Sequence, residues 1–298
     1  MPQTKSRRAV RTHRRFQGAI VVLAVIAIAV FIAVAISLRS RERVEPEPED
    51  PHAGQVLVND GNAEVWLSVQ EGVPVSPLQA EDFEPLGDQV AYYGHDAYAV
   101  QGIDVSEFQG DIDWQAVADS GIGFAYIRAG YRGYNAGTIG ADERFLTNLA
   151  GARAAGIKVG AYFFSQAITA EEAAEEAKFT VELLNGAKLD LPIMFDWETV
   201  SDSSARTNGL DGETITDCAE AFCKAAKKAG YEAGIYFSRQ QGYYVYDLSR
   251  LSDYTFWVAD PNPSPDFYYR MDVWQYDFEG DVPGIGIITD RNMMFLYD

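Results

Sequence analysis

The segment Leu191-Pro-Ile-Met-Phe-Asp-Trp-Glu198 is an apolar run that ends in two carboxylates, and it gives the first indication of the fold. Its length and composition predict a buried strand. Because side chains alternate along a strand, Asp196 and Glu198 share one face with Met194. Their α-carbons should lie about 7 Å apart, so the two acids cannot ionise independently and one pKa should rise. A raised acid beside an ionised one is typical of enzymes that break glycosidic bonds, whereas a solvated strand end is the plainer interpretation.

Similar runs recur along the chain and alternate with amphipathic segments. The predicted strands are 101–105, 123–130, 157–164, 191–197, 232–237, 255–259, 272–276 and 285–290, and the predicted helices are 113–119, 142–155, 170–186 and 213–229. Alternation of strand and helix predicts a parallel sheet, and about eight strands in about 200 residues fit a closed barrel better than an open sheet. The predicted fold class is therefore α/β, an irregular (β/α) TIM-like barrel, with helices that become short or absent after the fifth strand.

Four acids fall at the ends of these predicted strands. Asp196 and Glu198 end the fourth strand, and Asp104 lies near the end of the first. Asp290 ends the last predicted strand. Active sites of such barrels lie at the carboxyl ends of the strands, and the first and last strands of a closed barrel are neighbours. We therefore expect the four acids to meet at one mouth, although a single acid in such a place is more often solvated or a helix cap.

Several aromatic side chains and one arginine are candidate substrate contacts. The aromatic candidates are Tyr126, Tyr162, Tyr236 and Trp274. They fall on inward faces or at strand ends, where sugar rings could stack on them, although core packing explains each one as well. Arg128 shares a strand face with Tyr126 and could hold Asp104, a substrate carboxylate or a structural partner.

Composition restricts the ligand and the chemistry. The net charge is −20, yet residues 1–43 carry nine basic groups and one acid, so the remainder is strongly acidic. Such a domain repels nucleic acid, and we expect no nucleic-acid partner. His95 is the only histidine beyond the tail and the linker. This argues against a multi-histidine zinc site and a Ser-His-Asp triad, so we expect carboxylate chemistry without a cofactor.

The N-terminal part predicts a single membrane span. Residues 19–38 contain no charge and one polar side chain, which is enough to cross the hydrocarbon core as a helix. Basic residues are more numerous before this run than after it, so we expect the N-terminus in the cytoplasm and the large domain outside the cell. The alternative is a cleaved signal peptide, since Ala33-Val34-Ala35 resembles a cleavage site, and the domain would then be secreted. The predicted organisation is a basic cytoplasmic tail at 1–18, a transmembrane helix at 19–38, an acidic Pro-rich linker at 39–54, an extension at 55–100 and the barrel at 101–298. Within the extension we expect a β-hairpin at 55–70, with the turn at 59–62, and irregular chain at 71–100.

A set of motifs in the barrel region matches a known family in its order. They are Gly102-Ile-Asp-Val-Ser-Glu-Phe-Gln-Gly-Asp-Ile-Asp-Trp114, Phe124-Ala-Tyr-Ile-Arg-Ala-Gly130, Ala155-Gly-Ile-Lys-Val-Gly-Ala-Tyr162, Phe195-Asp-Trp-Glu198, Gly234-Ile-Tyr-Phe237, Trp274-Gln-Tyr276 and Asp290-Arg-Asn292. Over about residues 101–298 the sequence resembles the family 25 glycoside hydrolases, the Chalaropsis-type lysozymes. The resemblance implies an irregular α/β barrel without a metal. It also implies hydrolysis of the β-1,4 bond between N-acetylmuramic acid and N-acetylglucosamine in peptidoglycan.

The resemblance also implies roles for the acids. Glu198 would donate the proton to the leaving oxygen with Asp196 as its partner, and Asp104 and Asp290 would complete the cluster. Asp196 would assist attack by the 2-acetamido group of the substrate, or else the reaction inverts and a carboxylate activates water. Two other functions stay open: a catalytically silent glycan-binding wall scaffold, and a glycosidase of another N-acetylhexosamine polymer. The expected partners are peptidoglycan strands and, through the N-terminal helix, the membrane, with a monomeric barrel.

Overall fold

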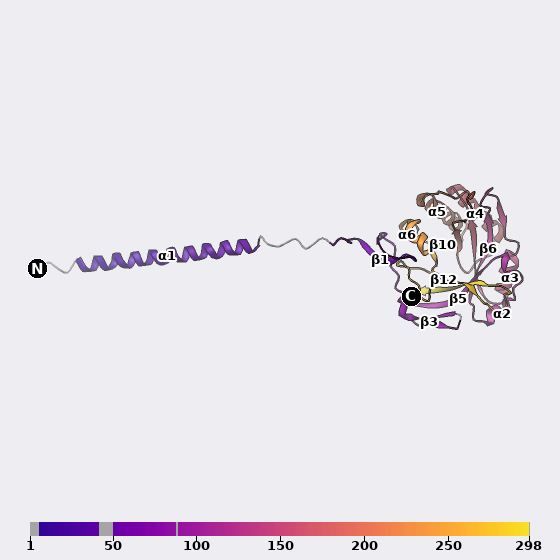
Figure 1. The fold of residues 1–298 in the computed structure, drawn as a ribbon, viewed down its shortest axis with the longest axis horizontal. Helices are drawn as coiled ribbons and strands as arrows, with labels where there is room; N and C mark the ends of the chain where they lie inside the picture. The colour runs from indigo at the N-terminus through magenta and orange to yellow at the C-terminus, as the bar shows by residue number, and fades with distance from the viewer. Residues whose placement is uncertain (1–5, 42–49, 88, 298) are drawn as a thin grey trace. The chain divides into compact units, whose positions relative to one another are not determined.

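The computed structural model describes residues 6–41, 50–87 and 89–297, and the chain divides into two compact units, Met1–Ala53 and Gly54–Asp298. The first unit contains one long helix, α1 (Ser6–Arg41), shown in indigo in Figure 1. Its segment Gly18–Ser40 is long and apolar enough to cross a membrane, and its side chains are exposed in this structure. Length and composition thus agree with the predicted span, and a signal sequence would share both properties.

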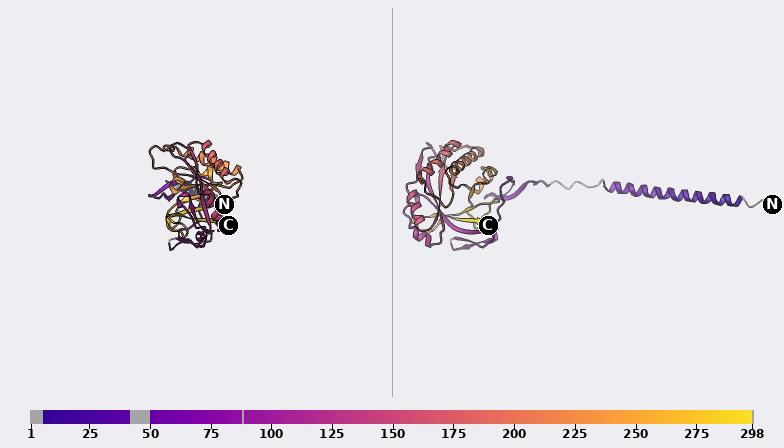
Figure 2. Two further views of the ribbon diagram at one scale, coloured as in Figure 1. Left: turned by 90° about the vertical axis from the view of Figure 1, so that its right-hand side faces the viewer. Right: turned by 180° about the vertical axis from the view of Figure 1, so that it is seen from behind.

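The second unit is a closed barrel of strands with helices on its outside (Figures 1 and 2). Its elements up to the fifth barrel strand are β1 (Gln55–Asn59), β2 (Glu64–Ser68), η1 (Ala80–Asp82), β3 (Phe83–Leu86), β4 (Gln89–Tyr92), β5 (Ala97–Val105), η2 (Glu107–Gln109), α2 (Trp114–Asp119), β6 (Phe124–Arg132), β7 (Ile139–Ala141), α3 (Phe145–Ala154), β8 (Lys158–Ser165), α4 (Ala170–Leu184), β9 (Ile193–Trp197), α5 (Gly212–Lys228) and β10 (Ala233–Ser238). The remaining elements are α6 (Arg239–Tyr244), α7 (Leu248–Leu251), β11 (Thr255–Ala259), β12 (Val273–Gly280) and β13 (Thr289–Tyr297). The strand order is β5-β13-β12-β11-β10-β9-β8-β6, the pairing of β5 with β6 closes the barrel, and β7 is added beside β6.

The predicted barrel is confirmed, but its strand directions are mixed. Neighbouring strands from β5 through β6, β8, β9, β10 and β11 to β12 are parallel. In contrast, β13 is antiparallel to both β12 and β5. The prediction of a last strand at 285–290 was therefore wrong, and Asp290 lies near the start of β13 instead of at a strand end. Because the strand is also reversed, its beginning reaches the mouth of the barrel, where Asp290 is the register partner of Asp104.

The helices bury their apolar faces against the outward-facing side chains of the strands. α4 and α5 begin at polar caps, where Thr169 accepts a hydrogen bond from the backbone of Glu172 and Asp211 accepts one from Thr214. The rings of Phe195 on β9 and Phe222 on α5 lie 5.3 Å apart in the outer core. After β10 the helices α6 and α7 are short, as the sequence predicted.

The interior of the barrel is filled by large side chains that stand beside glycines. The inner cluster consists of Phe124, Tyr126, Tyr162, Met194, Tyr236, Trp257, Ala259, Val273 and Met294. In the strand register, Gly102 is the partner of Phe124 and Gly160 is the partner of Tyr126. A Cβ atom on either glycine would collide with the ring beside it. These pairs close the barrel below its mouth, so a ligand can enter only from the carboxyl ends of the parallel strands.

The extension packs against the barrel and belongs to the same compact unit. Its strands β1 and β2 form an antiparallel hairpin, which confirms the hairpin predicted at 55–70. The prediction of irregular chain at 71–100 was wrong in part, because β3 and β4 lie there and β5 already begins at Ala97. The ring of Phe83 lies 5.4 Å from that of Trp274, and Asn59 Nδ2 donates to Asp266 Oδ2 at 2.9 Å. The extension therefore covers the outside of the last barrel strands.

Candidate active site

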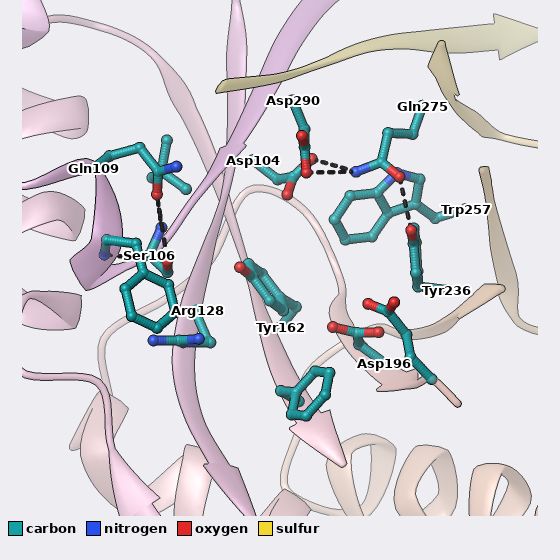
Figure 3. Close-up of a pocket in the computed structure, with 14 residues that line it drawn as sticks. Asp104, Ser106, Gln109, Arg128, Tyr162, Asp196, Tyr236, Trp257, Gln275 and Asp290 are labelled. Carbon is teal, nitrogen blue, oxygen red and sulfur yellow. Dashed lines mark hydrogen bonds between the residues drawn. The ribbon is translucent and has the colours of Figure 1, made fainter. Parts of the chain in front are cut away.

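A cavity of about 270 Å³ opens at the carboxyl end of the barrel (Figure 3). It brings together seven of the nine predicted site residues. They are Asp104, Arg128, Tyr162, Asp196, Glu198, Tyr236 and Asp290. Phe108, Trp257 and Gln275 also line it. Thus the four acids meet at one mouth, although they come from three separate strands, β5, β9 and β13.

The first acid pair comes from the end of β9. Asp196 is buried and Glu198, the first residue beyond the strand, is half-buried. Burial raises the pKa of both carboxyls, and the neighbouring charge of Glu198 raises that of Asp196 further. A hydrogen bond between the two raises the pKa of Asp196 and lowers that of Glu198. The first proton of this coupled pair therefore resides on Asp196, and burial is the main cause of the raised pKa of both carboxyls.

Two glutamine side chains, one buried and one half-buried, hold the backbone of this pair. Gln166 Nε2 donates to the carbonyl oxygen of Glu198 at 3.0 Å, and Gln241 Nε2 donates to that of Trp197 at 3.1 Å. Gln166 is fully buried, and its Oε1 accepts a hydrogen bond from Thr207 at 2.8 Å. Because β9 ends at Trp197, Glu198 has no strand partner, and the glutamine side chains take the place of the sheet hydrogen bonds.

The second acid pair lies across the neighbouring strands β5 and β13. Gln275 Nε2 donates to Asp104 Oδ2 at 2.8 Å and to Asp290 Oδ2 at 3.2 Å (Figure 3). Asn292 Nδ2 donates to the same Asp104 oxygen at 2.8 Å. Burial raises the pKa of Asp104 to about 6. Burial, together with the charge of Asp104, raises the pKa of Asp290 to about 9. At neutral pH Asp104 is therefore ionised while Asp290 keeps its proton.

Two aromatic side chains fix the orientation of these amides. Tyr236 donates its hydroxyl proton to Gln275 Oε1 at 2.7 Å, and Trp257 Nε1 donates to Asn292 Oδ1 at 2.8 Å. Since each amide oxygen is used in this way, each amide nitrogen must face the acids. Trp257 and Tyr236 therefore line the cavity and also set the hydrogen bonds of its floor.

Two predicted contact residues do not line the cavity. Tyr126 is fully buried inside the barrel, where its ring stacks on Trp257 at 4.7 Å between centres. Trp274 points to the outer face of β12, and its Nε1 donates to the backbone oxygen of Asp260 at 2.7 Å. The prediction that they contact substrate was wrong for this reason. Gln275 and Trp257 occupy the inward positions that the sequence analysis had missed.

The structure also settles which partner holds Arg128. Its Nε lies 2.9 Å from Asp142 Oδ2, and one terminal nitrogen lies 3.1 Å from Glu107 Oε1. Of the partners left open by the sequence, the structural ion pair is the one observed, whereas Asp104 is held by amides. Both acids lie outside the strand that carries Arg128, so the strand pattern alone gave no signal for them.

The arrangement combines two carboxyls with raised pKa values, an ionised acid and neutral hydrogen-bond donors within one small cavity. The proton on the Asp196–Glu198 pair can be transferred to a leaving oxygen, and the negative charge of Asp104 can stabilise positive charge in a bound substrate. Burial also raises the pKa of the Tyr162 hydroxyl well above its usual range, so that group remains a donor. Such a site suits a neutral, polyhydroxylated ligand.

Comparisons with known proteins agree with this chemistry. The family described as "Glycosyl hydrolases family 25" matches residues 103–285. The chain is 30% identical over 207 residues to Lysozyme M1 of Streptomyces globisporus, which covers 66% of this chain and 68% of that protein. The bacterial lysozyme of Streptomyces coelicolor superposes with a TM-score of 0.52 at 28% identity, covering 66% of this chain and 92% of that one.

A further similar structure was solved with a ligand. It is the modular autolysin LytC of Streptococcus pneumoniae in complex with a synthetic peptidoglycan ligand. The TM-score is 0.56 at 27% identity, and the match covers 66% of this chain and 46% of that one. Asp290 and the extension before residue 103 lie outside the part of the chain that the family matches.

Proposed function

Since this chain belongs to the family 25 glycosyl hydrolases, we propose that it cleaves the β-1,4 bond between N-acetylmuramic acid and N-acetylglucosamine in peptidoglycan. The proposal is carried by one observation, the cavity at the mouth of the barrel that Asp196, Glu198 and two further acids line together. It is supported by the lysozymes to which the chain is similar and by the peptidoglycan ligand of the autolysin.

In the proposed mechanism Glu198 is the general acid. When the substrate enters, the proton of the pair moves from Asp196 to Glu198, the glycosidic oxygen becomes the hydrogen-bond partner of Glu198, and Glu198 transfers the proton as the bond lengthens. Asp196 is left as an anion and accepts a hydrogen bond from the N–H of the 2-acetamido group. The carbonyl oxygen of that group attacks the anomeric carbon, and ionised Asp104 stabilises the positive charge of the ring.

The contact between Asp196 and Glu198 favours this route over inversion. An inverting pair is separated by about 6.5–9.5 Å to leave room for the attacking water. Asp196 and Glu198 share a hydrogen bond and leave no such room between them. We therefore expect retention, and proton NMR of the first product would exclude this mechanism if it showed the inverted anomer.

The test of the function is the Glu198→Gln variant of the full chain in detergent. Glutamine keeps the shape of the side chain and removes its acid, so lysis of purified cell walls should fall by roughly 100- to 10,000-fold. The variant should unfold at or above the temperature of the parent, because the substitution removes a buried carboxyl, and Glu182→Gln on the exposed side of α4 should keep full activity. Mass spectrometry of the released fragments separates a muramidase from a glycosidase of another N-acetylhexosamine polymer. Near-normal turnover by the Glu198 variant would refute its assignment.

We also propose that Gly18–Ser40 anchors the enzyme in the cell membrane with the barrel outside. The proposal rests on the length and apolar composition of this segment and on the basic residues that precede it. The intact mass of the chain purified from cells distinguishes this from secretion, because cleavage near Ala35 would remove the apolar segment.

A further inference from the structure

The guanidinium of Arg128 has two aromatic rings close to it at one side of the cavity. Its Cζ lies 4.8 Å from the centre of the Phe108 ring and 5.6 Å from that of the Tyr131 ring. Two ion pairs, with Glu107 and Asp142, hold the nitrogens of the same guanidinium. Cation–π attraction then holds the rings against a fixed plane. We call Phe108, Arg128 and Tyr131 the aromatic platform.

The position of Phe108 is not explained by packing. Its side chain is 70% exposed although it is large and apolar, and Tyr131 is 36% exposed. Phe108 lies in η2, which a capping box between Ser106 and Gln109 closes directly after β5. The backbone under the ring is therefore ordered, and the ring is presented to solvent by a rigid turn. An exposed aromatic ring that is held in place in this manner is typical of a binding surface.

The aromatic platform is continuous with the catalytic cavity. Phe108 and Arg128 both line the cavity, and Arg128 lies across it from Trp257 and Tyr236 (Figure 3). Phe108 follows Asp104 closely on the same strand end, so the platform begins where the acids end. The cavity of about 270 Å³ is too small to hold a whole glycan strand. A strand that is cut at those acids must therefore extend beyond the cavity on at least one side.

We propose that the aromatic platform binds a further N-acetylhexosamine residue of the same glycan strand, beside the sugars that contact the acids. The inference rests on the proposed function and names an additional subsite for its substrate. A pyranose ring presents an apolar face of C–H groups that stacks on an aromatic ring. Because Glu107 and Asp142 already neutralise Arg128, the platform favours a neutral sugar over an anionic group such as a stem-peptide carboxylate.

Strand binding to the full chain in detergent tests this subsite, with Glu198→Gln present in every protein so that no strand is cut. Calorimetry would use peptide-free strands of alternating N-acetylglucosamine and N-acetylmuramic acid, of two and of eight sugars. Phe108→Ala should weaken binding of the eight-sugar strand by roughly tenfold, because it removes one stacking contact. Phe108→Ala should change binding of the two-sugar fragment by less than about twofold. Phe108→Trp keeps an aromatic ring and should bind the long strand about as tightly as the parent protein does.

The matched control is Tyr98→Ala. Tyr98 has the same exposed fraction as Phe108, 70%, and lies near the opposite end of β5. Equal losses for Phe108→Ala and Tyr98→Ala, or equal losses for long and short strands, would overturn the subsite. If the parent protein binds no strand of either length, the proposed function itself fails and the subsite fails with it. All variants are expected to unfold at the temperature of the parent, since both rings are largely exposed.

Discussion

Replacing Asp104 by asparagine should make the folded protein more stable at neutral pH. The buried Asp104 carboxylate accepts hydrogen bonds from Gln275 and Asn292 on one oxygen, Oδ2, and its other side faces Asp290. Asparagine can accept both hydrogen bonds with its oxygen and donate from its amide nitrogen toward Asp290. The substitution therefore removes a buried charge without leaving the amides unpaired.

The size of the effect follows from the pKa of the carboxyl. Burial raises the pKa of Asp104 from 3.8 to about 6, and one unit corresponds to about 1.4 kcal/mol. Between these values the folded chain binds more protons than the unfolded chain, so this group favours folding below pH 3.8 and loses that contribution as the pH rises through 6. The contribution of Asp104 to the free energy of unfolding should therefore fall by about 3 kcal/mol between pH 3.8 and pH 6, and the Asp104→Asn variant should not show this fall.

Thermal unfolding at two pH values measures this gain. All five tryptophans of the chain lie in the unit Gly54–Asp298, so their fluorescence reports on the barrel and not on α1. At pH 7.5 the variant should unfold roughly 6–12 °C above wild type, and near pH 4 the difference should almost vanish. The same variant should lose wall-lytic activity, because it lacks the negative charge beside the substrate.

Asp202→Asn is the control for the chemical change itself. Hydrogen bonds from Ser204 hold the pKa of this exposed carboxyl below its usual value, so its replacement should give no gain at pH 7.5. The reasoning would be refuted by an Asp104→Asn protein that is no more stable than wild type at pH 7.5. It would be refuted equally by a gain of the same size at pH 4.

Two further predictions concern residues that support the site. Gln166→Leu removes the hydrogen bond to the Glu198 carbonyl. In steady-state hydrolysis of glycan strands it should lower kcat by roughly 10- to 100-fold and change KM by less than about twofold. An unchanged kcat would contradict a positioning role for Gln166. Gly160→Ala places a methyl group against the Tyr126 ring and should lower the free energy of unfolding by about 1–3 kcal/mol. Gly286 has open space around it, so Gly286→Ala should not change the stability measurably in thermal unfolding. Equal stabilities of the two variants would argue against the packing described for the barrel interior.

Half of the acid cluster could be predicted because a local rule places it. Alternation along β9 puts Asp196 and Glu198 on the face that also carries Met194, and the inner cluster contains Met194 as that rule requires. The reversal of β13 was not predictable from its own residues, since a strand has the same side-chain pattern in either direction. Asp290 reached the mouth although both its place in the strand and the direction of that strand were predicted wrongly.

The aromatic contacts were harder to predict for a different reason. Alternation states that Trp274 and Gln275 face opposite sides of β12, but it does not state which side is the interior. Hydrophobicity favours Trp274 inside, yet β3 and β4 cover the outer face and Phe83 packs on the Trp274 ring there. The polar Gln275 is left to face the acids, a position that only the packing of the extension explains.

The amino-acid sequence by itself determined the strand-and-helix alternation, the acids at the ends of β5 and β9 and the apolar N-terminal helix, because periodicity and composition act over a few neighbouring residues. Tertiary structure decided which acids are coupled, which amides orient them and where Arg128 finds its partners. Asp104 and Asp290 meet their amides because β13 pairs with both β5 and β12, which the chain brings together from the two ends of the barrel domain. Arg128 meets acids of two other segments of the folded chain.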